Sequence, residues 1–319
     1  MALKDAQKQI DMAITREGFR GLSAENTFAG VTSFARRSYA KDLSGVDLAI
    51  TGVPFDQAVT NRPGTRLGPR AIREASAMHA VDPPYGWGFD PLSDFAIADH
   101  GDMAFDYARA PDVPAAIEAH IGGILDAGAG VITLGGDHSI SLPILRAHAA
   151  RHGPVALLQF DAHTDTWADD DAHRVDHGTM FYKAVQEGLI DVAHSVQVGI
   201  RTQCPDRLGI AGIDAPEVHA IGAAATAARI REIIGDAKTY LSFDIDGLDP
   251  AFAPGTGTPV WGGLSSAQTA HILRAIAGID LLGGDVVEVS PPFDPTGITA
   301  IAGAHVAMEL LCLWCWSRR

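Results

Sequence analysis

Seven short runs of mainly Val, Ile, Leu and Phe recur along the chain, each bounded by Gly, Asp or Pro. Runs of this length and composition are typical of strands that are buried on both faces of a parallel sheet. This pattern restricts the chain to a small group of α/β folds. The expected strands are Leu48–Val53, Phe95–Ala98, Val131–Leu134, Val155–Phe160, Val196–Ile200, Thr239–Phe243 and Asp285–Val289.

Helical patterns fill the intervals between these runs. Pro69 is well placed to open a helix over Arg70–Ala77, because the first turn of a helix does not need the N–H group that proline lacks. Apolar residues at helical intervals indicate a helix around Ile117–Leu125, and capping residues begin two more at Ser139–His148 and Ser265–Ala277. Strands that alternate with helices predict a parallel sheet with helices on both faces.

The chain is expected to form one catalytic domain over residues 41–319, preceded by an N-terminal extension over residues 1–40. The extension is polar and loosely patterned, and no linker or shift in composition divides the remainder. The segment Thr299–Trp316 is strongly apolar, but it contains His305 and Glu309. We interpret it as a core helix rather than a membrane span.

Charge and cysteine content limit the binding partners and the cellular compartment that we expect for the protein. The 319-residue chain carries a net charge of −15, which disfavours nucleic acid and anionic membranes as partners and favours a small cationic substrate. An odd count of three cysteines argues against a disulfide framework and for a reducing cytoplasm. Cys312 and Cys315 have the spacing of a redox motif, but their apolar setting predicts two buried thiols.

Acidic and histidine side chains gather at the ends of four predicted strands. Sites in open α/β sheets form beyond the carboxyl ends of the strands, so these four segments are expected to meet at one edge of the sheet. The segments are Gly135–Ser139 (GGDHS), Asp161–Asp165 (DAHTD), Asp244–Asp249 (DIDGLD) and Glu288–Pro292 (EVSPP).

Spacing within these segments predicts a metal site. Alternate residues of an extended chain point to the same side, so Asp161, His163 and Asp165 can converge on one point. The same holds for Asp244 and Asp246. Buried carboxylates need a counter-charge, and no Lys or Arg lies within the four segments, which makes metal ions the expected counter-charge.

The ligand set indicates which metal and how many ions. Four carboxylates and two imidazoles without a thiolate favour Mn²⁺ over structural Zn²⁺. Six ligands exceed the needs of one ion and predict two ions about 3.5–4 Å apart that share bridging carboxylates. The expected metal ligands are His138, Asp161, His163, Asp165, Asp244 and Asp246.

Other catalytic and binding motifs do not fit the sequence. Asp244–Gly247 has its glycine too early for a calcium loop, and the distal Glu of such a loop is missing. Gly255–Pro259 (GTGTP) lacks the third glycine of a dinucleotide-binding fingerprint. The sequence contains neither a Gly-Lys-Ser/Thr phosphate loop nor a Gly-x-Ser-x-Gly nucleophile elbow.

At these residues the chain resembles the ureohydrolase (arginase) family, and within that family the agmatinases most. The resemblance extends from Thr51–Asp56 (TGVPFD) to Leu310. Besides the metal motifs, it rests on Gly64–Pro69 (GTRLGP), Asp176–Phe181 (DHGTMF) and Phe252–Pro259 (FAPGTGTP). It implies a single α/β domain with a central parallel eight-stranded sheet in an α/β/α arrangement, assembled as a homotrimer or homohexamer.

The resemblance also implies how the ligands divide between two Mn²⁺ ions. One ion is expected to bind His138, Asp161, Asp165 and Asp244, and the other Asp161, His163, Asp244 and Asp246. Asp161 and Asp244 then bridge the two ions. The pair is expected to convert a bridging water to hydroxide at neutral pH, and this hydroxide attacks the guanidinium carbon of the substrate.

Three residues have catalytic roles implied by the same resemblance. Asp165 is expected to orient the hydroxide, and Glu288 to hold the guanidinium through paired charge-assisted hydrogen bonds. His177 is expected to pass a proton to the departing amine and to contact the substrate. The implied reaction releases urea from a small guanidino compound.

The loop after the Asp-x-His-x-Asp motif guides the choice of substrate. Arginases use a polar Asn/Ser/Thr-rich loop there for the carboxylate of arginine, whereas this chain has Thr166–Arg174 (TWADDDAHR). The acidic residues suit a substrate with a distal ammonium group, and Trp167 can cover its methylene chain. We therefore expect agmatine, cleaved to urea and putrescine. The alternative is 4-guanidinobutyrate or another guanidino acid, whose carboxylate would meet Arg174.

Two more distant interpretations stay open. A metal-dependent amide hydrolase of related fold would use one zinc ion and fewer carboxylates, so metal content distinguishes it. A catalytically silent relative would act by binding alone and would release no urea from any guanidino compound. The complete ligand set, together with Glu288 and His177, argues against this last interpretation.

Overall fold

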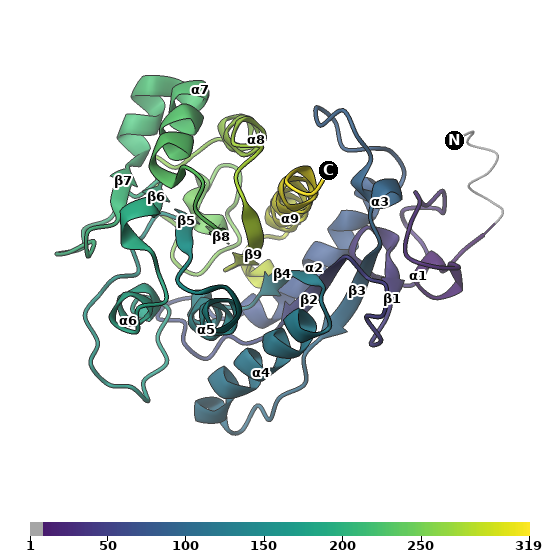
Figure 1. The fold of residues 1–319 in the computed structure, drawn as a ribbon, viewed down its shortest axis with the longest axis horizontal. Helices are drawn as coiled ribbons and strands as arrows, with labels where there is room; N and C mark the ends of the chain where they lie inside the picture. Colours follow the sequence, from purple (N-terminus) through teal and green to yellow (C-terminus); the bar gives the residue numbers. More distant parts are fainter. Residues whose placement is uncertain (1–8) are drawn as a thin grey trace.

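The expected alternation of strands and helices is present in the computed structural model, which describes residues 9–319. Across these residues the strands form one nine-stranded sheet in the order β1-β3-β2-β4-β9-β8-β5-β6-β7, and every pairing is parallel (Figure 1). The strands are β1 (Ser38–Tyr39), β2 (Leu48–Val53), β3 (Ile97–Asp102), β4 (Gly130–Gly135), β5 (Ala156–Phe160), β6 (Val196–Val198), β7 (Ala211–Ile213), β8 (Thr239–Asp244) and β9 (Leu281–Val287).

All seven strands predicted from the sequence are present, and the sheet has nine strands where the resemblance implied eight. The two strands that the apolar runs did not indicate are β1 and β7, which lie at the two edges of the sheet. They contain only two and three residues. An edge strand pairs on one side only and needs no long apolar run, so it leaves little signal in the sequence.

The strand β9 begins earlier and ends earlier than the sequence predicted. Glycine is disfavoured inside strands, yet Gly283 and Gly284 both lie inside β9. A Cβ atom at Gly283 would lie 2.6 Å from the backbone oxygen of Val131 on β4, so this position favours glycine for close approach of the backbone. The strand ends at Val287 because Glu288 adopts a positive φ of 63°.

Helices cover both faces of the sheet. One face packs against α2 (Gly68–Ala75), α7 (Ala215–Ile234), α8 (Ser266–Ala275) and α9 (Ile298–Trp316). The other face packs against α4 (Val113–Asp126), α5 (Ser141–His152) and α6 (Met180–Gln186). Figure 1 shows α7 and α8 above the strands and α4 below them. The short helices α1 (Met12–Thr15) and α3 (Pro91–Asp94) lie near the N-terminal part of the sheet.

The apolar C-terminal segment forms the core helix α9, as the sequence predicted. It is long and apolar enough to cross a membrane, but 78% of its most apolar window is buried inside the protein. Cys312 and Cys315 are unpaired and buried within it. Glu309 is buried on the same helix, where it accepts hydrogen bonds from Trp87 and Arg274.

Part of the segment expected as an N-terminal extension packs against the sheet. Residues 1–8 lie outside the described part of the chain. Phe34 and Arg37 are fully buried, and β1 pairs with β3 at the edge of the sheet. The predicted boundary between an N-terminal extension and the catalytic domain stays a prediction.

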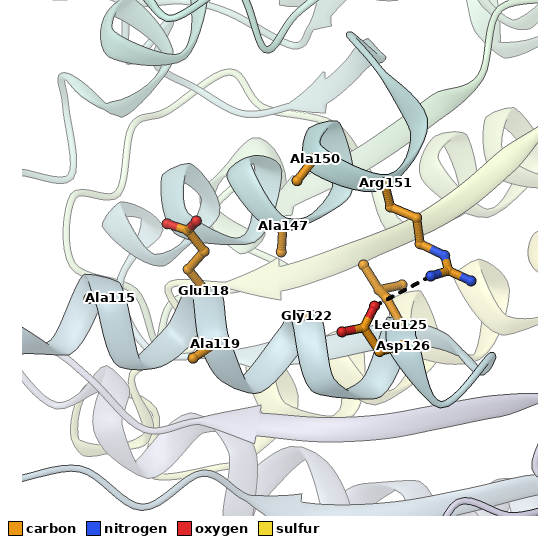
Figure 2. A pocket seen from close by; sticks show the side chains of 9 residues that line it. All are labelled: Ala115, Glu118, Ala119, Gly122, Leu125, Asp126, Ala147, Ala150 and Arg151. Carbon is orange, nitrogen blue, oxygen red and sulfur yellow. Dashed lines mark hydrogen bonds and ion pairs between the residues drawn. The ribbon is translucent and has the colours of Figure 1, made fainter.

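A surface groove of about 550 Å³ lies between α4 and α5 (Figure 2). Small side chains line much of it, and Arg151 faces Asp126 across one end at 3.5 Å. The groove takes no residue from the four strand-end segments. It is therefore separate from the candidate site described next.

Candidate metal centre

The four segments that the sequence singled out follow four adjacent strands of the sheet. The strands β4, β9, β8 and β5 are neighbours at its centre (Figure 1). His138 begins a short 3₁₀ helix three residues after β4 ends at Gly135, and Asp161 directly follows β5. Asp244 is the last residue of β8, and Glu288 directly follows β9. Because the strands are parallel, all four segments lie at the carboxyl ends of the strands, on one side of the sheet, as predicted.

Three carboxylate oxygens surround one nitrogen of His138. Its Nδ1 atom lies 2.9 Å from Oδ2 of Asp165, 3.2 Å from Oδ2 of Asp161 and 3.2 Å from Oδ2 of Asp244. All four side chains are buried. Despite these short distances, Nδ1 makes no hydrogen bond of normal geometry within residues 9–319. The four atoms converge on a shared point and form the first ligand group.

A second ligand group lies on the other side of Asp161. The Nδ1 atom of His163 is 3.4 Å from Oδ1 of Asp161 and 3.2 Å from Oδ2 of Asp246. Asp161 therefore offers one oxygen to each group. Asp244 lies in the first group, and its Oδ1 atom accepts a hydrogen bond from the backbone of Asp246.

The spacing of these donor atoms fits a divalent cation. Ligands that stand at right angles about 2.2 Å from an ion lie about 3.1 Å apart, and the observed separations in the first group are 2.9–3.2 Å. A nitrogen without a hydrogen bond beside buried carboxylates is also a donor set that suits a divalent metal ion. The residues present therefore fit a metal centre.

Without a bound cation, the carboxyl groups of this centre leave an excess of negative charge. Burial, together with the charges of neighbouring aspartates, raises the pKa of Asp165 to about 6 and that of Asp244 well above its usual value. Burial also raises the pKa of Asp246. Asp161 behaves differently, because the neighbouring imidazoles of His138 and His163 outweigh its burial and lower its pKa. A bound cation would stabilise the ionised form of all four carboxyls.

Arg201, which lies beyond the end of β6, is a cation close to the centre that the sequence did not indicate. Its guanidinium donates hydrogen bonds to the backbone oxygens of Asp246, Leu248 and Val260. It thereby holds the loop after β8 in place without neutralising a ligand carboxylate through a direct hydrogen bond. The expectation that metal ions supply the main counter-charge remains compatible with its position.

Two residues of the site have strained backbones. Asp165 and Glu288 adopt positive φ angles of 54° and 63°, in the left-handed region that costs a non-glycine residue about 1–2 kcal/mol. Such strain persists where the surrounding structure holds it, and it is frequent at functional sites. Here it turns the Asp165 side chain back toward His138 and the Glu288 side chain toward His177.

Glu288 and His177 form a buried pair beside the first ligand group. The Nδ1 atom of His177 lies 3.0 Å from Oε1 of Glu288, which also accepts the backbone N–H of His138. The second carboxylate oxygen, Oε2, is buried without a hydrogen-bond partner in residues 9–319. Burial alone would lower the pKa of His177, but the hydrogen bond and charge of Glu288 raise it to about 9.

A cavity of about 450 Å³ opens onto this centre. His163, Asp165 and His177 line its inner part, and Trp167 lines its wall with 49% of its surface exposed. Arg174 also lines the cavity, and its guanidinium pairs with Asp176 at 2.7 Å. The remaining lining residues are Thr60, Ala168, Gly178, Thr179, Asp244 and Thr258.

The acidic part of the loop after β5 does not line this cavity. Asp169 pairs with Lys183 at 2.9 Å, and both side chains are buried. Asp170 accepts a hydrogen bond from Tyr182. Besides Asp165 and Asp244 at the candidate metal centre, the acidic residue that lines the cavity is Asp176, from the segment before His177. The acidic residues of Thr166–Arg174 that the sequence pointed to therefore do not line the cavity, in part because Lys183 on α6 pairs with Asp169, and Asp176 lies outside that segment.

Several buried polar residues that contact the ligands were missed in the sequence. Gln159 donates a hydrogen bond to Asp161, and Gln197 donates one to Gln159. Ser242 contacts Nε2 of His138 and donates to Asp285. All four of these polar residues interrupt apolar strand runs, which is the signal that could have identified them.

Comparisons with known proteins identify the family to which the chain belongs. The sequence profile of the Arginase family matches residues 46–312. An agmatinase from Chromobacterium violaceum is 54% identical over 304 residues, which cover 95% of this chain and 94% of that protein. Two solved structures cover more than nine tenths of the chain.

The first of these structures is a hypothetical agmatinase from Burkholderia thailandensis, with a TM-score of 0.94, 56% identity and coverage of 96% of this chain and 97% of that one. The second is proclavaminate amidino hydrolase from Streptomyces clavuligerus, with a TM-score of 0.84, 37% identity and coverage of 92% of this chain and all of that one. By profile, sequence and fold, the chain belongs to the arginase family.

Proposed function

We propose that this arginase-family hydrolase cleaves agmatine to urea and putrescine with the help of two Mn²⁺ ions. The observation that carries the proposal is the pair of ligand groups that share Asp161 at the floor of a cavity. The agmatinases among its relatives support the choice of substrate. A cytoplasmic location and a homotrimeric or homohexameric assembly belong to the same proposal, and the unpaired cysteines support the first.

The ligand groups indicate which residues would hold each ion. His138, Asp161, Asp165 and Asp244 would hold one, and Asp161, His163 and Asp246, with Asp244 as a second bridge, would hold the other. When bound, such a pair supplies a nucleophile from water at neutral pH. Urea release measured with added Mn²⁺ over a set of guanidino compounds tests the proposal, together with metal content per chain. One zinc ion per chain and no urea would favour an amide hydrolase instead.

Glu288 is the group best placed to bind the guanidinium of the substrate. Its Oε2 atom is buried and has no hydrogen-bond partner in the described chain, so it can accept from a substrate N–H group. Its Oε1 atom is fixed by His138 and His177. A carboxylate held in this way orients the guanidinium carbon above the ligand groups, and Asp165 can accept a hydrogen bond from the attacking nucleophile.

His177 can move a proton at the end of the reaction. Its Nδ1 atom faces Glu288, and its Nε2 atom lies 2.8 Å from the hydroxyl oxygen of Thr60. The backbone N–H of Thr60 also points to Nε2 at 3.1 Å and favours the neutral ring, which opposes the effect of Glu288. The ring is therefore poised to hold a proton and to give it to the departing amine.

His177→Asn is expected to lower turnover by about 10²- to 10⁴-fold and to leave metal content unchanged, because the side chain moves a proton and binds no ion. His177 is protonated below its pKa of about 9 and loses its proton above it. Turnover of the wild type should therefore fall as the pH rises through about 9, and the variant should lack this fall. The measurements are pH profiles of urea release and metal analysis. His194→Asn, at an exposed histidine paired with Asp191, is the matched control.

The charges at the cavity mouth favour a cationic substrate over a guanidino acid. Asp176 and Arg174 both line the cavity, and Asp176 is the less exposed of the pair, with 15% of its side-chain surface exposed against 58%. A distal ammonium group can bind Asp176, the more enclosed of the two charges, whereas a carboxylate would meet Arg174 at a more exposed position. Arg174 nevertheless keeps 4-guanidinobutyrate as the second candidate substrate.

The value of kcat/KM for agmatine is expected to exceed that for 4-guanidinobutyrate at least tenfold. In Arg174→Ala this ratio should rise by a further factor of about two to five, because the variant removes the cation that repels agmatine and attracts a carboxylate at an exposed position. Both substrates are assayed by urea release. Arg109→Ala, which removes an exposed arginine paired with Asp112, controls for the change in net charge. Faster turnover of the acid by the wild type would overturn the assignment.

A further inference from the structure

A buried network of hydroxyl groups surrounds Asp285 behind the metal centre. Asp285 lies inside β9 and is fully buried. Its Oδ2 atom accepts hydrogen bonds from Ser141 and from Tyr240, each at 2.7 Å. Its Oδ1 atom accepts one from Ser242, also at 2.7 Å. An unpaired polar group in this position would be costly, so the three donors account for how the strand accommodates a carboxylate.

The same network continues to the imidazole of His138. The hydroxyl oxygen of Ser242 lies 2.8 Å from Nε2 of His138. A carboxylate can only accept hydrogen bonds, so the Ser242 hydroxyl must donate its proton to Asp285. Its oxygen is then left to accept, and Nε2 of His138 must carry the hydrogen. The lone pair of a neutral ring consequently lies on Nδ1, which is the atom that faces the carboxylates of the first ligand group.

We propose that Asp285 is a positioning residue, which acts through Ser242 to hold His138 in the tautomer that offers Nδ1 to a cation. The proposal rests on the metal binding in the proposed function and adds how one ligand is oriented for it. The pKa of Tyr240 is raised well above its usual value by burial and by the charge of Asp285, so its hydroxyl remains a donor to Asp285. Partners of this kind typically change metal affinity by about 10- to 100-fold.

Asp285→Asn provides the sharpest test, because it nearly conserves shape while it changes the direction of the hydrogen bonds. Oδ2 of Asp285 accepts from two donors and Oδ1 from one, so the amide nitrogen of the variant is expected to take the Oδ1 position. It then donates to Ser242, whose hydroxyl turns to donate to Nε2 of His138. The hydrogen of a neutral ring moves to Nδ1 and blocks the lone pair that a cation needs.

The expected result is a loss of about 10- to 100-fold in Mn²⁺ affinity at the first ligand group in Asp285→Asn, with the other site less affected. Ser242→Ala should cause a smaller loss, because it frees the ring to adopt either tautomer. Tyr240→Phe removes a donor from the same buried network but keeps the link to His138, and it should bind Mn²⁺ as the wild type does. Affinities are measured by titration of the full chain with Mn²⁺, with free Mn²⁺ followed by electron paramagnetic resonance.

A second measurement reads the tautomer without a metal. In ¹⁵N-histidine-labelled, metal-free protein at a pH at which the His138 ring is neutral, the Nε2–H signal of His138, assigned by its absence in His138→Asn, should be present in the wild type and lost in Asp285→Asn. Equal Mn²⁺ affinity in Asp285→Asn and wild type, or a larger loss in Ser242→Ala than in Asp285→Asn, would overturn the proposal. If Asp285→Asn does not fold, equal Mn²⁺ affinity of Ser242→Ala and Tyr240→Phe would overturn the proposal. A wild type that binds no Mn²⁺ but keeps the Nε2–H signal would contradict the proposed function and not the orientation of His138.

Discussion

Asp161→Asn is expected to reduce urea release from agmatine by at least about 10³-fold and to reduce bound Mn²⁺ to one ion per chain or fewer. Asp161 is the residue that gives one oxygen to each ligand group, at 3.2 Å from His138 and 3.4 Å from His163. An amide keeps the shape but removes the negative charge, and its nitrogen cannot serve as a ligand oxygen. One group therefore loses its Asp161 oxygen, and the other keeps only a neutral amide oxygen in place of a charged one. Asp244→Asn is expected to act in the same direction.

The measurements for this prediction are metal analysis of the purified variant and steady-state urea release with added Mn²⁺. Asp170→Asn is the matched control, because Asp170 lies in the neighbouring loop, is exposed and accepts a hydrogen bond from Tyr182. It should retain full activity and two ions. Two tightly bound Mn²⁺ ions in Asp161→Asn would contradict the shared carboxylate and the dinuclear centre with it.

Glu288→Gln is expected to lower kcat/KM for agmatine by about 100- to 1000-fold while both ions stay bound. The reason is that removal of one partner from a buried charge pair costs about 3–5 kcal/mol, and the guanidinium loses its buried carboxylate. The amide oxygen can still accept the backbone N–H of His138, so the ligand group should keep its shape. The charge that raises the pKa of His177 is lost as well, so the alkaline fall in turnover should move to lower pH.

Steady-state kinetics with agmatine, pH profiles and metal analysis together check this expectation. Glu187→Gln is a suitable control, because Glu187 is a surface residue that pairs with Arg146, and neither residue lines the cavity. Loss of metal in Glu288→Gln, or an unchanged kcat/KM, would count against a role in binding the guanidinium.

The convergence of the predicted ligand residues could be foreseen from sequence because strands impose a simple rule. Asp161 and His163 alternate directly after an apolar run, and a parallel sheet places the ends of such runs at one edge. The close approach of His138, Asp161, Asp165 and Asp244 follows from that rule. The division between two groups was implied only by family resemblance, since spacing alone does not say which oxygen of Asp161 faces which histidine.

Other parts of the site depend on contacts between residues far apart in the chain. Thr60 meets His177 from 117 positions away, and Ser242 meets His138 from 104. The acidic loop illustrates the same limit, because Lys183 on α6 pairs with Asp169 and leaves Asp176 to line the cavity. No local pattern encodes which partner a side chain finds once the helices have packed.

The sequence by itself determined the α/β class, the central strands and the edge of the sheet at which acids and histidines gather, because burial and alternation are local properties of a strand. Tertiary structure alone decided the short edge strands β1 and β7, the strained backbones of Asp165 and Glu288, and the hydrogen-bond direction from Asp285 to His138. These features arise from packing between distant segments, which selects one arrangement among several that the local sequence allows equally.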